Sequence, residues 1–178
     1  MQTNSRRCRW CADDALLIRY HDREWGRPIR TDAGHLERMA LEIFQCGLSW
    51  RIVLVKRPAL RDAFDGFNPP RVSRMSPRDV DRLAGNPAII RNRRKIEATI
   101  ANAAAFVSLA RENGSYARWF NALRADSPAG RRALFDEFRR RFRFMGPETT
   151  RCYLMGVGKI PPEHDSGCTL GIHQKSTP

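Results

Sequence analysis

The turn Gly85-Asn86-Pro87 constrains the fold more than any other short stretch of this sequence. Before it, Ser76-Pro77-Arg78-Asp79 supplies an N-cap, a proline at the first helical position and an acid at the third. After it, apolar residues recur with helical spacing from Ile96 to Val107, up to Asn113-Gly114. Two helices joined by so short a turn form an antiparallel hairpin.

Helical spacing also dominates the rest of the chain. Further helices are predicted from Asp32 to Gly47, from Ser49 until Pro58 breaks the pattern, from Ser127 to Phe142, and after Gly146. No alternating Val/Ile-rich segment predicts a strand. We therefore expect an all-α fold, with residues 1–171 as a single domain and 172–178 as a disordered tail.

The chain is strongly basic. Its 178 residues include 32 Lys and Arg against 19 Asp and Glu, a net charge of +13. Such a charge favours a polyanionic partner such as nucleic acid, although a solvated Arg-rich surface is the alternative. The sequence has no apolar run long enough to span a membrane and no apolar N-terminal segment. We expect a cytoplasmic protein with no membrane partner.

Cysteine and histidine residues gather near both ends of the chain. Two residues separate Cys8 from Cys11, and three residues separate His164 from Cys168. Zinc takes four thiolate or imidazole ligands. Spacing alone selects these four residues, with His21 as the rival to Cys11. The alternative is a set of small buried side chains.

The segment from Leu41 to Trp50, LEIFQCGLSW, combines an acid, a glycine turn and an indole. Glu42 falls at the edge of the apolar stripe, so an ordinary solvated glutamate is one interpretation. Gly47 permits a sharp turn, and Trp50 follows three residues later. An indole and a carboxylate together suit a cationic planar ring.

Four basic residues follow the hairpin turn: Arg91, Arg93, Arg94 and Lys95. Cations are unfavourable at a helix N-terminus unless an anion binds there. A DNA phosphate would supply that anion, and a solvated basic face is the alternative. The segment Tyr20–Gly26, YHDREWG, has no clean period of 2 or 3.6, so we expect a loop that carries a site.

Together these residues resemble the DNA-3-methyladenine glycosylase I family, which has a helix-hairpin-helix fold. The resemblance extends from about Arg7 to Cys168. It is carried by six features in order: RCRW, YHDREWG, LE with QCGLSW, IIRNRRKI, FRFMGPETTRCY, and His164 with Cys168.

The resemblance implies a structural Zn²⁺ that joins the N- and C-terminal segments. Its ligands would be Cys8, His21, His164 and Cys168, which leaves Cys11 outside the set. The predicted loop would then supply one ligand.

The resemblance also implies a base pocket lined by Tyr20, Glu42 and Trp50, with Glu42 as the catalytic residue. Leu48, on the same loop, would wedge into the duplex. The expected DNA-binding residues are Gly47, Leu48, Gly85, Arg91, Arg93, Arg94 and Lys95.

The implied activity is that of a monofunctional, monomeric DNA glycosylase acting on double-stranded alkylated DNA. It would flip out 3-methyladenine and hydrolyse the N-glycosidic bond, leaving an abasic site. The alternative is a non-catalytic, zinc-stapled helix-hairpin-helix module. Five residues depart from the family pattern, three of them expected to flank the pocket and influence substrate choice: Leu17 and Ala88, then Ile43, Phe44 and Ile52.

Overall fold

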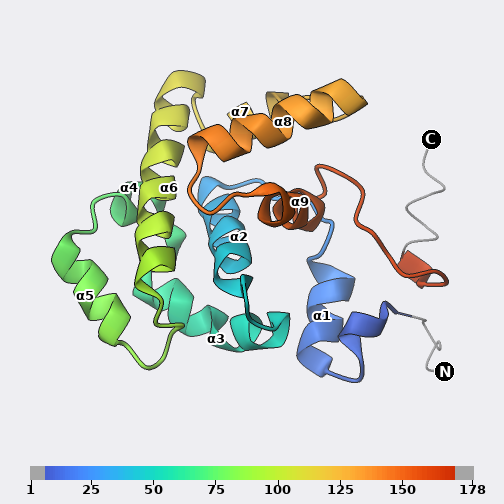
Figure 1. Ribbon diagram of the computed structural model, residues 1–178, viewed down its shortest axis with the longest axis horizontal. Helices are drawn as coiled ribbons and strands as arrows, with labels where there is room; N and C mark the ends of the chain where they lie inside the picture. Colours follow the sequence, from blue (N-terminus) through green and yellow to red (C-terminus); the bar gives the residue numbers. More distant parts are fainter. Residues whose placement is uncertain (1–6, 171–178) are drawn as a thin grey trace. The chain divides into compact units, whose positions relative to one another are not determined.

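The computed structural model describes residues 7–170, and no strand occurs among them (Figure 1). The predicted all-α class is therefore confirmed. None of the described helices combines the length and apolar character of a membrane span. The helices are α1 (Ala15–Arg23), α2 (Asp32–Gln45), α3 (Trp50–Ala63), α4 (Pro69–Val72), α5 (Pro77–Gly85), α6 (Arg93–Asn113), α7 (Tyr116–Ala122), α8 (Pro128–Arg141) and α9 (Pro147–Gly156), with 3-10 turns η1 (Arg9–Cys11) and η2 (Asp65–Phe67).

The chain divides into two compact units. The terminal unit comprises residues 1–28 and 154–178, and the helical unit comprises residues 29–153. The units meet at two points in the chain, one between residues 28 and 29 and the other within α9, between residues 153 and 154. The single domain predicted over 1–171 stays a prediction, and the predicted tail 172–178 lies outside the described residues.

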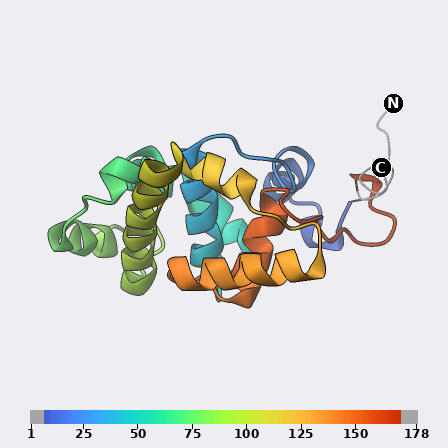
Figure 2. The same cartoon turned by 90° about the horizontal axis from the view of Figure 1, so that it is seen from above.

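Helix α2 is the centre of the helical unit. It packs against α3, α4, α6 and α7, and it runs beside α6 in both ribbon views (Figures 1 and 2). Every residue from His35 to Phe44 is buried. A helix enclosed on all sides must also bury the charged residues of its sequence, here Glu37, Arg38 and Glu42.

Helix α5 begins as its capping residues predict, and residues 86–92 connect it to α6. The Oγ of Ser76 accepts from the N–H of Asp79, whose carboxylate accepts in return from the N–H of Ser76. Past the end of α5, the N–H of Ala88 donates to Oδ1 of Asn86 at 2.9 Å. Ala88 is not in the left-handed region, and a Cβ added at Gly85 would meet nothing within 4 Å. The turn therefore depends on Asn86 and needs no glycine.

Pro58 does not end its helix, contrary to the sequence-based expectation. Helix α3 continues from Trp50 to Ala63 because buried residues flank the proline on both sides: Val53 and Leu54 before it, Leu60 after it. Burial of each aliphatic side chain contributes about 1.5–3 kcal/mol. Together these outweigh the ~3 kcal/mol cost of a proline inside a helix.

The predicted loop at Tyr20–Gly26 is wrong for its first four residues. Helix α1 extends to Arg23, and the carboxylate of Asp14 caps its start. The buried positions are Leu17, Tyr20 and His21, which have the i, i+3, i+4 spacing of one helical face. Counting Tyr and His as polar hid this pattern in the sequence.

An ion-pair cluster connects α2 to α3. The buried carboxylate of Glu37 accepts from Nε of Arg57 at 2.8 Å and from an Arg61 guanidinium nitrogen at 2.7 Å. Burial alone would raise the pKa of Glu37, but the hydrogen bonds from Arg61 and Arg57 reverse this and hold it below its ordinary value. The cluster therefore stabilises the pair of helices that carry Glu42 and Trp50.

Replacement of Glu37 by Gln tests this cluster. A lowered folded-state pKa stabilises the fold above the unfolded pKa of about 4.3, and that contribution is lost as the pH falls through the folded-state value. We expect Glu37→Gln to reduce the free energy of unfolding by about 2 kcal/mol at pH 7, and by less below pH 4. Urea denaturation at both pH values measures this. The exposed control Glu112→Gln should change stability by under about 0.5 kcal/mol; equal effects of the two variants would contradict the account.

Candidate functional site

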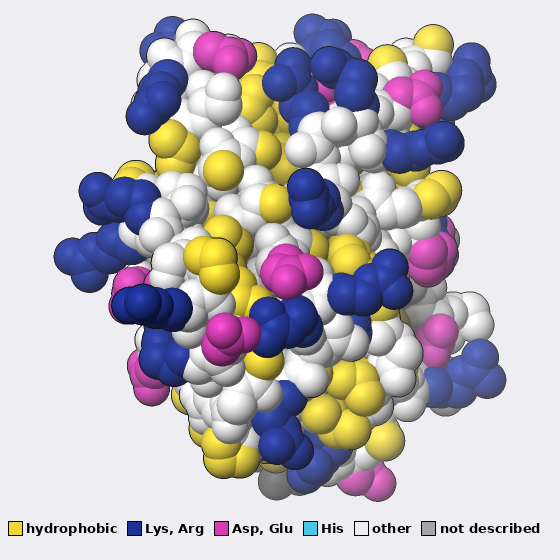
Figure 3. All heavy atoms as spheres, turned by 60° about the vertical axis from the view of Figure 1, so that its left-hand side comes forward, with side chains coloured by type: hydrophobic (Ala, Val, Ile, Leu, Met, Phe, Trp, Pro, Cys, Tyr) yellow, Lys and Arg dark blue, Asp and Glu magenta, His cyan; other side chains and the backbone are white. Residues whose placement is uncertain are grey.

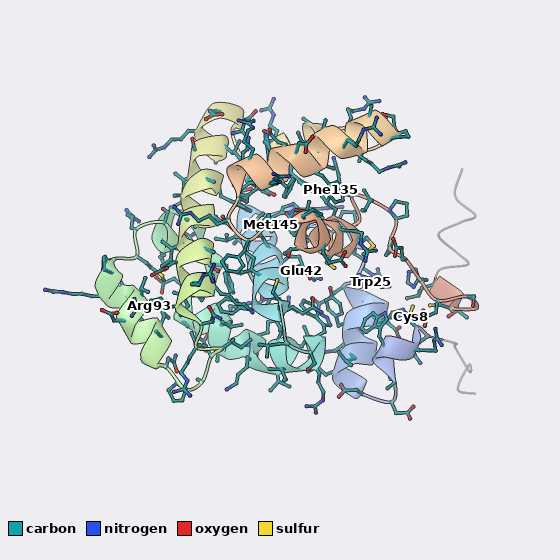
Figure 4. All side chains as sticks on the ribbon, viewed as in Figure 1. Cys8, Trp25, Glu42, Arg93, Phe135 and Met145 are labelled. Carbon is teal, nitrogen blue, oxygen red and sulfur yellow. The ribbon has the colours of Figure 1, made fainter. Side chains whose placement is uncertain are left out.

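The terminal unit brings together two thiols and two imidazoles. One potential ligand atom from each of Cys8, His21, His164 and Cys168 lies within 4.8 Å of all the others. Nδ1 of His164 is 3.4 Å from the Cys8 sulfur and 3.3 Å from the Cys168 sulfur. Nε2 of His21 is 3.5 Å from the same Cys168 sulfur. Figure 4 labels Cys8 within this group.

Neighbouring polar groups orient these side chains. Nδ1 of His21 is 2.8 Å from a carboxylate oxygen of Asp22, which leaves Nε2 directed at the cluster. Arg7 forms an ion pair with the same Asp22 at 2.8 Å. The backbone N–H of Asp165 donates to the Cys8 sulfur at 3.3 Å. A carboxylate behind a histidine is the usual support of a metal-ligating imidazole.

Cys11 is buried beside the cluster but is not among the four. The ligand set chosen by spacing alone is therefore not the one that the structure assembles, because α1 places His21 at the cluster instead. Two thiols and two imidazoles fit the ligand preference of zinc. Burial raises the pKa of the Cys8 thiol to about 11, so a thiolate at neutral pH requires an adjacent cation.

Glu42 lies inside the helical unit rather than on a solvated edge. Its residue is 6% exposed, and Figure 4 shows it on α2. Burial raises its pKa to about 7, against the opposing charge of Arg38 one turn earlier. A carboxyl with a raised folded-state pKa stabilises the fold fully below pH 4.5 and progressively less as the pH rises to 7. The helical unit thus loses stability by holding an ionisable acid here, which is typical of functional sites.

The segment after α2 presents apolar side chains to solvent. Gly47 adopts φ +79°, a left-handed conformation that glycine permits. Leu48 is 38% exposed and Trp50, the first residue of α3, is half-buried. Ile52 is also exposed. These apolar side chains lie on the segment and the first turn of α3 that follow the helix carrying Glu42.

Two of the expected pocket neighbours lie elsewhere. Ile43 and Phe44 are fully buried in the core of the helical unit, so the departures at these two positions affect core packing.

Tyr20 belongs to the terminal unit, where it is buried and its ring centroid lies 6.3 Å from that of Trp10. Sequence reasoning missed Cys152 of α9, whose thiol pKa is raised to about 12 by burial and by the charge of Glu42.

Three arginines around the start of α6 are exposed: Arg91, Arg93 and Arg94. Arg93 pairs with Asp81 of α5. The Arg94 guanidinium carbon lies 5.7 Å from the ring centroid of Phe144. Figure 3 shows the face of the molecule that carries α5 and α6, and basic side chains on this face are spread among apolar ones.

Lys95 differs from these arginines. It is 6% exposed, and its ammonium group donates to the backbone oxygens of Phe44 at 2.9 Å and Cys46 at 2.5 Å. This contact corrects the sequence-based assignment of Lys95 to the DNA face. The ammonium group at the start of α6 is therefore hydrogen-bonded to carbonyl oxygens at the end of α2.

The cysteine–histidine cluster yields a prediction that separates the two candidate ligand sets for zinc. We expect His21→Ala to lose bound zinc on dialysis, because it removes one of four ligands, and Cys11→Ala to retain a full equivalent. Metal analysis of both purified variants measures this. Zinc retained in the first variant and lost in the second would reverse the assignment.

The sequence of this chain is similar to a known family and to individual proteins. The methyladenine glycosylase family matches residues 10–170. The chain is 40% identical over 103 residues to a DNA-3-methyladenine glycosylase of Haemophilus influenzae, and 47% identical over 109 residues to DNA-3-methyladenine glycosylase 1 of Escherichia coli K12. These matches cover 58% and 61% of this chain, and 56% and 57% of the relatives' own lengths.

Solved structures agree with the match. A crystal structure of 3-methyladenine DNA glycosylase I superimposes with a TM-score of 0.80 at 33% identity, covering 92% of this chain and 98% of that one. A glycosylase I in complex with 3-methyladenine gives a TM-score of 0.77 at 26% identity, covering 89% and 99%. With the family match spanning nearly the whole described chain, this protein belongs to the methyladenine glycosylase family.

Proposed function

We propose that this protein is a monofunctional DNA glycosylase that removes 3-methyladenine from alkylated double-stranded DNA by hydrolysis. One observation carries the proposal: a buried carboxyl with a pKa near neutrality, Glu42, lies on the helix that leads directly to Leu48 and Trp50. A DNA-binding module that contacts only the backbone has no use for such a group. Family membership supports the same substrate class.

The substrate base must leave the duplex before the protein can hold it. Flipping a nucleotide costs a few kcal/mol, and less when alkylation has already weakened pairing and stacking. The exposed side chain of Leu48 follows the turn at Gly47, and it fills the space that the flipped base vacates. Apolar wedges of this kind stabilise kinked DNA.

Charge then distinguishes the damaged base from normal ones. While joined to its sugar, 3-methyladenine carries a delocalised positive charge. Trp50 offers an aromatic face to that cation, an attraction of up to ~2 kcal/mol when desolvated. A cation beside Glu42 lowers the pKa of its carboxyl from about 7, so the acid is ionised when the substrate is bound.

Hydrolysis needs modest assistance because methylation makes the base a good leaving group. The bond between the sugar C1′ and the base nitrogen breaks, and the base leaves with the bonding electron pair as neutral 3-methyladenine. Water adds its oxygen to C1′ and releases a proton to solvent, which leaves an abasic site. The Glu42 carboxylate stabilises the positive charge that passes to the sugar.

The hairpin holds the DNA backbone. Arg91, Arg93 and Arg94 are exposed at the start of α6, where the first backbone N–H groups of a helix point outward and attract anions. We interpret the α5–α6 pair as the helix-hairpin-helix of this fold. The expected state of the protein is a monomer.

The resident metal we propose is Zn²⁺, held by Cys8, His21, His164 and Cys168. Its part is structural: when bound, it cross-links the N-terminal segment to the C-terminal segment of the terminal unit. Zinc contributes roughly 10–16 kcal/mol in small zinc peptides, ample to hold two chain ends together.

Base release from methylated DNA tests the function. We expect the wild-type protein to release 3-methyladenine, detected by chromatography, and Glu42→Gln to slow release at least 100-fold because the amide cannot become an anion. The exposed control Glu112→Gln should retain full activity. Tight DNA binding by the wild-type protein without base release would contradict the proposal and favour a non-catalytic binding module.

A further inference from the structure

We propose that Lys95 is a positioning residue, which fixes the base-binding segment Cys46–Trp50 to the DNA-binding hairpin. The proposal rests on the function proposed above and adds a residue outside the pocket. Lys95 lies in the first turn of α6, three residues past the N-cap Asn92. Its ammonium group is buried against the end of α2, where the segment begins.

One of the four terminal carbonyl oxygens of α2, that of Phe44, takes its hydrogen bond from this ammonium group. The last four carbonyl oxygens of a helix have no partner within the helix and need donors from elsewhere. The carbonyl oxygen of Glu42 accepts from the Cys46 thiol at 3.6 Å, and that of Ile43 accepts from the Cys46 N–H at 3.3 Å. The carbonyl oxygen of Gln45 accepts from the Leu48 N–H at 2.7 Å. The carbonyl oxygen of Phe44 accepts from the Lys95 ammonium group at 2.9 Å.

Three of those donors come from the segment itself, so they move with it. Lys95 is different because it belongs to another helix, and it also holds the oxygen of Cys46, one residue before Gly47. The Lys95 contact therefore sets the position of the segment relative to α6. It places a cation at the negative end of the α2 dipole, where a cation is favourable.

A second lysine, on α3, contacts the hairpin turn rather than the end of α2. Nζ of Lys56, on α3 after the segment, donates to the backbone oxygen of Pro87 in the hairpin turn at 3.0 Å. The position of the segment relative to α6 is set by the Lys95 contact, so a phosphate held at the hairpin fixes, through Lys95, where Leu48 and Trp50 meet the duplex. Lys56 serves as the matched control, because its partner is an oxygen of the hairpin turn and not an oxygen at the end of α2.

Loss of the Lys95 contact should affect catalysis more than binding. Without it, the oxygens of Phe44 and Cys46 lose a buried donor and the segment can shift. A misplacement of about 1 Å can cost on the order of 100-fold in rate. The exposed arginines of the hairpin remain, so the electrostatic attraction to DNA is retained.

The test compares Lys95→Met with Lys56→Met and Glu37→Gln. Single-turnover release of 3-methyladenine is measured at saturating methylated DNA, together with the salt dependence of binding to undamaged duplex. We expect Lys95→Met to slow release roughly 10- to 100-fold, with an unchanged salt slope and affinity within about twofold. Lys56→Met and the destabilised Glu37→Gln should keep the wild-type rate per folded molecule, because neither touches the end of α2.

Three results would overturn the proposal. A normal rate with weaker binding and a salt slope reduced by about 1 would make Lys95 a phosphate ligand. An equal loss of rate in Glu37→Gln would assign the effect to general destabilisation. A wild-type rate and wild-type binding in Lys95→Met would remove any role. If Lys95→Met does not fold, Lys95→Arg replaces it: its planar fork cannot occupy the ammonium position, and a full rate would overturn the proposal.

Hydrogen exchange separates this proposal from the proposed function. Amides of Cys46–Trp50 should exchange about tenfold faster in Lys95→Met, and at the wild-type rate in Lys56→Met, whether or not the protein releases any base. Unchanged exchange in Lys95→Met would overturn the positioning role. A wild-type protein that releases no base would instead defeat the proposed function, with the exchange result still deciding the role of Lys95.

Discussion

The complete enclosure of α2 is the constraint on which the rest of the helical unit depends. Ten consecutive residues of this helix are buried, from His35 to Phe44, and charged groups among them must find partners or change their ionisation. Glu37 finds two arginines and stays ionised. Burial raises the pKa of Glu42, and the charge of Arg38, which acts in the opposite direction, does not cancel that rise. One helix therefore carries a structural acid, Glu37, and the acid for which we propose a function, Glu42, and the two differ in their partners.

The terminal unit meets a different constraint, since it must join two ends of the chain over little apolar area. Its Cys8 and Cys168 lie with Cys11 in a small apolar cluster flanked by Trp25 and Ile18. The two histidines complete a group whose atoms suit a metal. We therefore propose that a bound metal holds the N-terminal and C-terminal segments to each other.

Much of the fold could be predicted from the sequence because its helix boundaries use strong local signals. The capping residues at Ser76 and Ser127 and the stop at Gly114 all act within a few residues. The errors arose where tertiary packing decides. Pro58 lies inside α3, which buried residues on either side of the proline stabilise. The buried face of α1 is formed partly by Tyr20 and His21, which a hydrophobic pattern does not count as apolar.

The candidate site could be predicted less completely, and for the same reason. Glu42 and Trp50 could be chosen as candidates from their chemistry, but the burial of Glu42 depends on the helices around α2. Lys95 has the sequence context of a phosphate ligand, since it follows three arginines. Only the fold shows that the end of α2 lies within reach of its side chain.

The ionisation of Glu42 is the most direct measure of this account. Carbon-13 NMR of the glutamate carboxyl groups, with Glu42→Gln to assign the resonance, follows its titration in the folded protein. The account predicts a midpoint near pH 7. A midpoint at the ordinary value of 4.5 would show a solvated carboxylate and contradict the account.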